Sequence, residues 1–314
     1  MVGSTSVSVT KSGGATGSGI ADADGAPHVA AASDAARRNR RAVDTPGADA
    51  ANMENTVVSR APTRPALSRR ASNLAGVDFA VEFVDQNRTF VDRALAADLD
   101  TAVPTCPGWT LKQVVRHVGG GDRWAAQIVG DRMTGPLEFG DIRDARAPAD
   151  PAAARHWLRA GAQLLVDAVA DADGTEVWTF EGPRPAGWWL RRRLHETLVH
   201  NADVAIAVGA RFEPTASVAA DAISEWLDLA TARADLSGAS LHLHATDDEL
   251  GEHGEWTVAE GTWSHRHAKG DVALRGPAAD LLLALTRRRA IEDTAIELFG
   301  DTGRWQSWLD STPF

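Results

Sequence analysis

Glu196 and His200, four positions apart, lie in a segment from 191 to 203 that contains neither glycine nor proline. Good helix formers dominate this segment, so it is predicted to be an α-helix. Because a helix turns by about 100° per residue, Glu196, His200 and Asp203 share one face, whereas His195 points away from it. A carboxylate and an imidazole on one face are two ready-made ligands for a divalent metal ion.

A third metal ligand must come from elsewhere in the chain, and His117 is the best candidate. It lies on the apolar stripe of a predicted helix that begins at Thr110, so its side chain is expected to point inward. A buried histidine needs a polar partner. Two imidazole nitrogens and one carboxylate oxygen suit zinc with an open fourth position, which is typical of catalytic rather than structural sites.

The pattern is not the His-Glu-x-x-His motif of zinc proteases, because three residues separate Glu196 from His200. The glutamate is therefore predicted to be a ligand, with His195 flanking the site. Two roles are open for Asp203: it orients His200 through the second ring nitrogen, or it is simply solvated. The plainer interpretation of Glu196 and His200 is a routine pair on a surface helix.

Alternating histidines near the C-terminus form a rival metal-ligand pattern. His242 and His244 stand on one predicted strand, and His265 and His267 on another. A His-x-His pair projects both rings from the same face of a sheet. No carboxylate is spaced to complete the set and these strands are expected to be exposed edges, so we interpret the four residues as ordinary solvated histidines.

The single cysteine, Cys106, lies in a Pro-Cys-Pro turn just before the His117 helix. It could be a nucleophile or a fourth ligand, but a packed structural turn is the favoured interpretation, because no histidine or lysine stands beside it to activate the thiol. One cysteine excludes an intramolecular disulfide and fits a reducing cytoplasm.

The bulk composition excludes several classes of function. The 314 residues are 44% hydrophobic and 24% charged, enough for two domains with proper cores. A formal net charge of −11 argues against a nucleic-acid or anionic-membrane partner. No apolar run approaches the ~20 residues of a membrane span.

Three regions are predicted along the chain. Residues 1–75 lack apolar periodicity and are expected to be a disordered extension. Their basic cluster precedes no hydrophobic segment, so no export signal is expected, and Met53 is an alternative start. Residues 76–212 are predicted to form a four-helix bundle, with the run of glycines at 119–121 allowing a close approach to the backbone.

Residues 213–314 are predicted to form a small α+β domain. A helix from Ser217 to about Ala234 should precede short alternating strands and a helix that starts near Pro277, followed by short helical pieces. The expected strands lie at 241–245, 255–258, 262–265 and 271–274. The segment from Val177 to Trp189 is predicted to be a loop that leads into the helix at 191, and Trp109, Trp124, Trp188 and Trp189 are expected near the ligands.

Three stretches together resemble the mycothiol-dependent maleylpyruvate isomerase family of actinobacteria. They are Val-Pro-Thr-Cys-Pro-Gly-Trp-Thr at 103–110, Val-Val-Arg-His-Val-Gly-Gly at 114–120 with Arg123-Trp124 after it, and His-Glu-Thr-x-x-His-x-x-Asp at 195–203. The resemblance extends from about residue 76 to the C-terminus.

The resemblance implies a DinB-like four-helix bundle that holds zinc through His117, Glu196 and His200, the same residues that the helix geometry selects. It implies a sterol-carrier-like C-terminal domain, and an arginine near the end of that domain in the site. Arg287 and Arg288 are the nearest matches and are our candidate catalytic residues.

The implied chemistry is the activation of mycothiol, a low-molecular-weight thiol, by zinc, which lowers the pKa of the thiol. If the thiolate adds to a conjugated double bond and leaves after rotation, the reaction is cis–trans isomerisation; if it stays, the reaction is thiol transfer. The expected partners are the thiol and a small electrophile, in a monomer or small homo-oligomer. A non-catalytic protein with a structural metal and a small-ligand pocket is the alternative.

Overall fold

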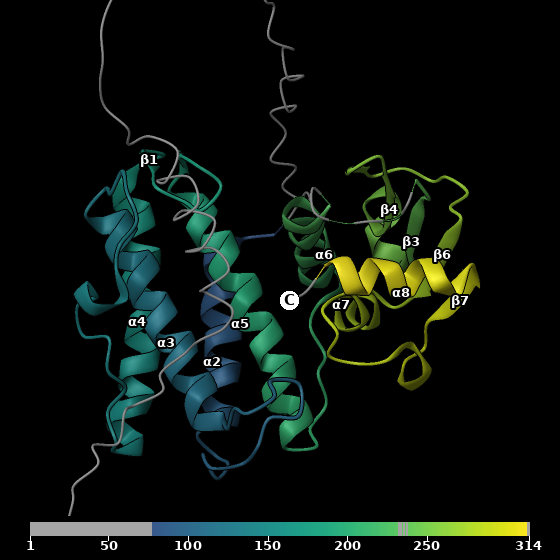
Figure 1. Ribbon diagram of the computed structural model, residues 1–314. Helices are drawn as coiled ribbons and strands as arrows, with labels where there is room; N and C mark the ends of the chain where they lie inside the picture. The colour runs from purple at the N-terminus through teal and green to yellow at the C-terminus, as the bar shows by residue number, and fades with distance from the viewer. Residues whose placement is uncertain (1–76, 232–233, 235, 237, 313–314) are drawn as a thin grey trace, which may run out of the picture. The chain divides into compact units, whose positions relative to one another are not determined.

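The computed structural model describes residues 77–231, 234, 236 and 238–312 (Figure 1). The predicted disordered extension, residues 1–75, lies outside the described residues. Within the described part, a helix-rich region is followed by a region with a mixed five-stranded sheet.

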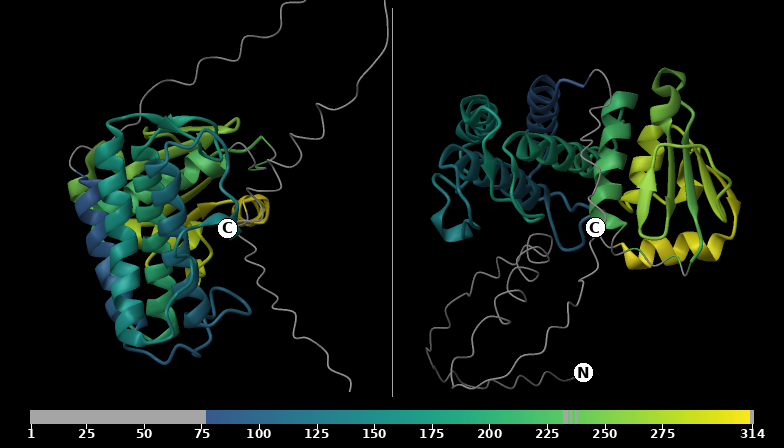
Figure 2. Two further views of the ribbon diagram at one scale, coloured as in Figure 1. Left: turned by 90° about the vertical axis from the view of Figure 1, so that its left-hand side faces the viewer. Right: turned by 90° about the horizontal axis from the view of Figure 1, so that it is seen from above.

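The helix-rich region consists of four long helices that lie alongside one another (Figures 1 and 2). Helix α3 packs mainly along α4, and α2 packs mainly along α5. Their bounds are α2 Phe79–Ala94, α3 Leu111–Gly130, α4 Pro151–Ala172 and α5 Gly187–Ala207. A short 3-10 turn, η1 at Phe139–Asp141, lies in the connection between α3 and α4.

The starts of α3 and α4 follow from local sequence. Thr110 and Gln113 form the predicted capping box at the start of α3, which satisfies backbone N–H groups that the first turn leaves open. The Asp150 side chain accepts a hydrogen bond from the backbone N–H of Ala153, and Pro151 occupies the first turn of α4, where its missing N–H costs nothing.

Two glycines of α3 allow its neighbours to approach closely, as the sequence predicts. A β-carbon at Gly119 would lie 2.0 Å from the Trp157 ring of α4, and one at Gly121 would lie 2.8 Å from the guanidinium of Arg193 in α5. At Gly120, by contrast, a β-carbon would make only an ordinary van der Waals contact, with its nearest neighbour 3.9 Å away. The run of glycines therefore allows α4 and α5 to pack against the same turn of α3.

The segment before α5 differs from the predicted loop. It contains two short paired strands, β1 Glu176–Val177 and β2 Arg184–Pro185, and α5 begins earlier than expected, so Trp188 and Trp189 are helical. Trp189 is buried, and its indole N–H donates to the Trp178 carbonyl at 2.8 Å. Burial of this large ring against the loop outweighs the turn signals of the neighbouring prolines and glycines.

The C-terminal region begins with α6 and forms one mixed sheet in the order β5-β4-β3-β6-β7. Strand β3 pairs in parallel with β6 and antiparallel with β4. The element bounds are α6 Ala216–Ala230, β3 Leu241–Ala245, η2 Asp248–Gly254, β4 Glu255–Ala259, β5 Thr262–Ser264, β6 Val272–Gly276, α7 Ala278–Leu285, η3 Ile291–Asp293, β7 Glu297–Gly300 and α8 Thr302–Ser311.

Two expectations about this sheet are wrong. Strand β3 is central rather than an edge, and the edge strand β7 replaces part of the predicted helical pieces near the C-terminus. Most of β7 is solvent-exposed, so its four residues show no alternation that a sequence could reveal, and its pairing with β6 defines it. Helices α6 and α7 pack on one another, and α7 packs on β3 and β6, so the helices bury one face of the sheet.

None of the described helices is long and apolar enough to span a membrane.

Candidate functional site

The structure brings the three predicted metal ligands together. His117 projects from α3, and Glu196 and His200 project from α5. The Nε2 atom of His117 lies 3.2 Å from Oε1 of Glu196, and the Nε2 atom of His200 lies 3.5 Å from the same oxygen. Three potential ligand atoms therefore face one another from two packed helices, as the i, i+4 spacing on α5 predicts.

These distances match those around a tetrahedral metal ion. Ligand atoms about 2.1 Å from zinc and separated by the tetrahedral angle lie about 3.4 Å from one another. Both distances to the Glu196 oxygen are within a few tenths of an ångström of that value. The side chain of His200 is 3% exposed, that of His117 10% and that of Glu196 15%, so the group is nearly closed to bulk water.

The environment of His117 favours the neutral form of its ring. Burial lowers the pKa of His117, and the hydrogen bond with Glu196 offsets this only in part. The ring also contacts Trp109 edge-on, with centroids 5.3 Å apart. A neutral imidazole has a free lone pair, which is the form that binds a metal.

Asp203 is buried beneath His200 and decides the tautomer of that ring. Its Oδ2 atom lies 2.8 Å from Nδ1 of His200. A carboxylate only accepts, so the Nδ1–H of His200 donates to it and Nε2 is left to face Glu196. Of the two roles that the sequence leaves open for Asp203, the orienting one therefore fits the contacts, since the side chain is buried rather than solvated.

Asp203 itself is held by donors from two other parts of the chain. The guanidinium of Arg288, just after α7, donates to both carboxylate oxygens, at 3.0 and 3.2 Å. The hydroxyl of Thr105 donates at 2.6 Å and the thiol of Cys106 at 3.4 Å. Arg288 is buried and thereby connects the C-terminal region to the His200 side of the site.

These contacts also govern protonation. Burial alone would raise the pKa of Asp203, but the hydrogen bond with His200 and the charge of Arg288 hold it well below its usual range. Burial would lower the pKa of His200, but its hydrogen bonds, that with Asp203 first, raise it well above the usual value. Because a metal displaces protons from its ligands, Nε2 of His200 is the atom that would lose one on metal binding.

Sequence reasoning missed the charged residues that hold the second oxygen of Glu196. Arg192, one turn earlier on α5, contacts both Oε2 of Glu196 and the carboxylate of Glu225 in α6. His195 lies within 2.9 Å of Glu225 and 3.1 Å of Asp221, also in α6. The only available signal was the i, i+4 spacing of Arg192 and Glu196, which does not reveal that α6 supplies the two acidic partners.

Of the two candidate arginines, only Arg288 has a described contact with this group. The side chain of Arg287 is exposed, and its backbone has a positive φ of 59° at the end of α7. The thiol of Cys106 is buried against Asp203, consistent with the favoured interpretation of a packed turn.

Most of the predicted tryptophans gather in a separate aromatic cluster. Trp124, Trp188 and Trp189 contact one another or share neighbours, and Trp178 and Phe180 join them at centroid distances of 4.7–6.2 Å. Trp109 is the one of the predicted four with a described contact to a ligand residue, His117.

The rival pattern near the C-terminus is not simply solvated. His242 is buried on the central strand β3, and Glu255 of β4 lies 3.0 Å from it. The expectation that no carboxylate completes this set is wrong, because the antiparallel pairing of β3 and β4 brings Glu255 beside His242 although thirteen positions separate them.

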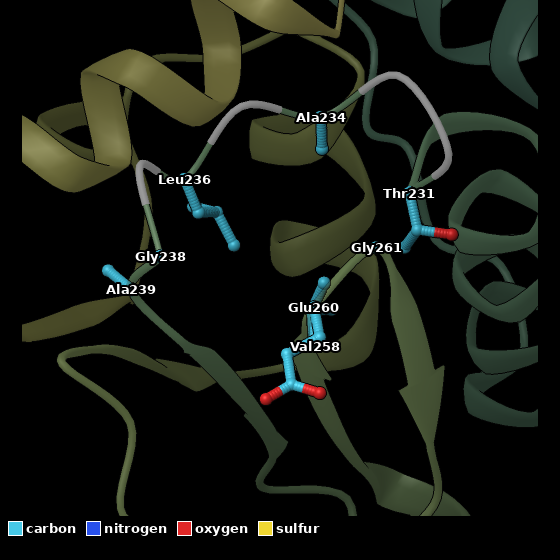
Figure 3. A pocket seen from close by; sticks show the side chains of 8 residues that line it. All are labelled: Thr231, Ala234, Leu236, Gly238, Ala239, Val258, Glu260 and Gly261. Carbon is cyan, nitrogen blue, oxygen red and sulfur yellow. The ribbon is translucent and has the colours of Figure 1, made fainter.

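A pocket in the C-terminal region lies apart from both histidine groups. Figure 3 shows its lining, in which Glu260 is the only charged side chain among the described residues. The other lining residues are Thr231, Ala234, Leu236, Gly238, Ala239, Val258 and Gly261. Among the described residues, this small hollow contains no set of metal ligands.

The chain thus consists of a helix-rich region that carries three candidate metal ligands, followed by a region with a mixed sheet. Two family models match the chain in that order: the mycothiol maleylpyruvate isomerase N-terminal domain over residues 80–205, and the C-terminal domain of the same family over residues 217–307. The chain belongs to the mycothiol-dependent maleylpyruvate isomerase family.

Solved structures agree with this assignment at the level of the fold. The chain is similar to a crystal structure of the mycothiol-dependent maleylpyruvate isomerase, with a TM-score of 0.52 and 15% identity over 70% of this chain and 91% of that one. A mutant of that isomerase gives a TM-score of 0.51 with the same identity and coverage. No curated protein sequence matches the chain.

Proposed function

We propose that this chain is a zinc- and mycothiol-dependent isomerase that acts on a small conjugated electrophile of the maleylpyruvate type. The observation that carries the proposal is the meeting of His117, Glu196 and His200 at near-tetrahedral spacing, in a chain of this family. We further propose that α2–α5 form a DinB-like four-helix bundle within residues 76–212, and that residues 213–314 form a sterol-carrier-like domain.

The donor set fits zinc. His117 and His200 would each present Nε2, and Glu196 would present Oε1. Two imidazoles and one carboxylate leave a fourth position for a thiol, and the bound ion would supply the Lewis acidity that lowers the pKa of that thiol. Zinc is thiophilic, so a thiol needs no protein base beyond this site.

The surrounding residues favour a thiol over a water molecule as the activated group. Water activation needs a nearby general base. Glu196 is engaged with both histidines and Arg192, and Asp203 already accepts hydrogen bonds from His200, Thr105 and Arg288. Neither carboxylate is placed to take a proton from water, and the chain's own thiol, Cys106, is buried, so the sulfur would come from a small molecule.

The remaining residues hold the ligands in place. Asp203 fixes the tautomer of His200, and Arg288 balances the buried charge of Asp203. Arg192 restrains the second oxygen of Glu196 so that the first faces both imidazoles. In this role Arg288 is a positioning residue, whereas the exposed Arg287 stays a candidate for direct contact with the substrate.

The reaction that this arrangement supports conserves all atoms. A thiolate adds to one carbon of a conjugated double bond, the resulting single bond rotates, and the thiolate leaves as the double bond re-forms in the trans geometry. The thiol is regenerated, so no other co-reactant is consumed. Retention of the thiol in the product would instead be a transfer reaction at the same site.

The test compares turnover of maleylpyruvate with and without mycothiol. Isomerisation that requires both the thiol and zinc supports the proposal, and a stable thiol adduct would redirect it to an S-transferase. Zinc-dependent hydrolysis of an ester in thiol-free buffer would contradict it. Zinc binding without turnover of any electrophile would favour the non-catalytic ligand-binding alternative.

A further inference from the structure

A second cluster of metal-ligating side chains lies on the sheet of the C-terminal region. His242 projects from β3, Glu255 from β4, and His267 from the loop between β5 and β6. The Oε2 atom of Glu255 lies 3.0 Å from Nε2 of His242 and 2.6 Å from Nδ1 of His267. One ligand atom from each residue lies within 4.8 Å of both others, so the three face one point.

The strand register explains how these residues meet. His244 pairs with Glu255 and His242 with Thr257, so all four side chains emerge from the same face of the sheet, opposite to Leu241 and Leu243. Glu255 is therefore the diagonal neighbour of His242, within reach of its imidazole. The ring of His244 lies 6.2 Å from that of His242 and provides a further imidazole at the edge of the cluster.

The loop that carries His267 is anchored to these same strands. The hydroxyl of Thr257 donates to the carbonyl of Arg266 at 2.8 Å, directly before His267. At Gly270, on the other side, a β-carbon would lie 2.9 Å from the backbone nitrogen of His242, so the loop passes against β3 with no room for a side chain. These two contacts hold the His267 backbone over the cluster before any ion binds.

Burial and charge also favour a cation at this point. The side chain of His242 is 7% exposed and that of Glu255 22%, whereas that of His267 is 74% exposed and free to adjust. Around zinc the ligand atoms would lie about 3.4 Å apart, so the two contacts of Glu255 need to lengthen by less than 1 Å. The cationic side chain opposite His244 on β6, Arg275, is paired with Glu297 and its charge is thereby balanced.

We propose that His242, Glu255 and His267 form a second site for a divalent transition-metal ion, independent of the His117 site, which ties the 265–270 loop to the sheet. Two imidazoles and one carboxylate are the ligand set that zinc accepts, and solvent or His244 would complete the coordination. The proposal does not depend on the proposed isomerase activity, because none of these residues contributes to the His117 site.

The experiment uses the full chain, Zn²⁺ as the probe, and Glu255→Gln as the test variant, which keeps the shape of the side chain but replaces its charged ligand. Glu249→Gln, the same change on an exposed glutamate of η2 in the same region, is the matched control. After removal of metal, zinc stoichiometry is measured by titration. We expect the wild type and Glu249→Gln to bind one more equivalent of zinc than Glu255→Gln.

Trypsin provides a second measurement that does not depend on counting ions. Arg266 and Lys269 are exposed cleavage sites on either side of His267, and Glu255→Gln leaves the sequence of this loop unchanged. At a zinc concentration ten times its dissociation constant, loop cleavage should slow about tenfold in the wild type and in Glu249→Gln, and remain unchanged in Glu255→Gln. Circular dichroism confirms that each variant is folded.

The double variant His117→Ala/His200→Ala separates this proposal from the proposed function. It should lose the zinc of the helical site and keep the zinc-dependent protection of the loop. Equal zinc stoichiometry in the wild type and in Glu255→Gln would overturn the second site. Zinc bound without loop protection would overturn the assignment of His267 as a ligand.

Discussion

The two histidine–glutamate–histidine groups have the same donors and opposite surroundings. In the helical group, His200 is held by Asp203, which accepts further hydrogen bonds from Arg288 and Thr105 deep inside the protein. In the sheet group, His267 contacts Glu255 from a short anchored loop, and its side chain is mostly exposed. Because metal affinity depends on how firmly the ligands are held, the helical group should bind zinc more tightly and exchange it more slowly.

Removal of a ligand from the helical group should have the largest effect on zinc binding and activity. His200→Ala should lower zinc affinity and kcat/KM by more than about 100-fold, because loss of a ligand exceeds the 10–100-fold loss typical of an outer partner. Elemental analysis after dialysis and isomerase assays measure both. His242→Ala is the matched control and should retain full activity. Retention of activity by His200→Ala, together with loss in His242→Ala, would place the catalytic metal on the sheet instead.

The next effect concerns the buried partner of His200. Asp203→Asn keeps the size of the side chain but removes the negative charge that faces the buried Arg288. We expect a 10–100-fold loss of zinc affinity and a stability loss of about 3–5 kcal/mol, the cost of breaking a buried charge pair. Zinc titration and denaturant unfolding measure the two quantities.

A second variant separates the positioning role of Asp203 from its contribution to stability. Arg288→Met removes the opposite charge, so the double variant Asp203→Asn/Arg288→Met should regain stability without regaining zinc affinity. Full recovery of both would show that Asp203 acts only through folding. The helical site would then lose the feature that distinguishes it from the sheet site.

Packing provides a smaller effect that is confined to one of the two regions. Gly119→Ala places a β-carbon 2.0 Å from the Trp157 ring and should destabilise the helices by about 1–3 kcal/mol. Gly120→Ala, at an open position of the same helix, should be stabilising by about 0.5–1 kcal/mol. Thermal unfolding of both variants tests this. Zinc protection of the 265–270 loop should be unchanged in each, and a change would show that the two regions are coupled.

The difference between the groups also explains what the sequence could predict. Glu196 and His200 lie one turn apart, and His117 lies on an apolar stripe, so local periodicity is enough to select them. Asp203 was found for the same reason. The partners from α6, Asp221 and Glu225, could not be found because their approach depends on tertiary packing.

On the sheet, the residues of the cluster are related by pairing rather than by local spacing. The prediction placed His242 on a strand correctly, but it made β3 an edge and so left the histidines in solvent. Glu255 comes next to His242 only after β4 pairs with β3, and β7 becomes a strand only by pairing with β6. Strand register is set by non-local contacts, which a period-2 pattern in five residues does not specify.

The smallest expected effect distinguishes the two neighbouring arginines after α7. Arg288 is buried on Asp203, whereas Arg287 is exposed, so their substitution should have different consequences. Arg287→Ala should leave zinc content unchanged and raise KM no more than a few-fold, because an exposed charge acts through solvent that screens it. Arg288→Ala should lower zinc affinity and stability together, because it removes the positive charge that balances the buried Asp203 carboxylate. Steady-state kinetics and zinc titration of both variants compare them.

If Arg287→Ala instead lowers kcat strongly with zinc in place, Arg287 contacts the reacting substrate, and the loop after α7 contributes to catalysis directly as well as through Asp203.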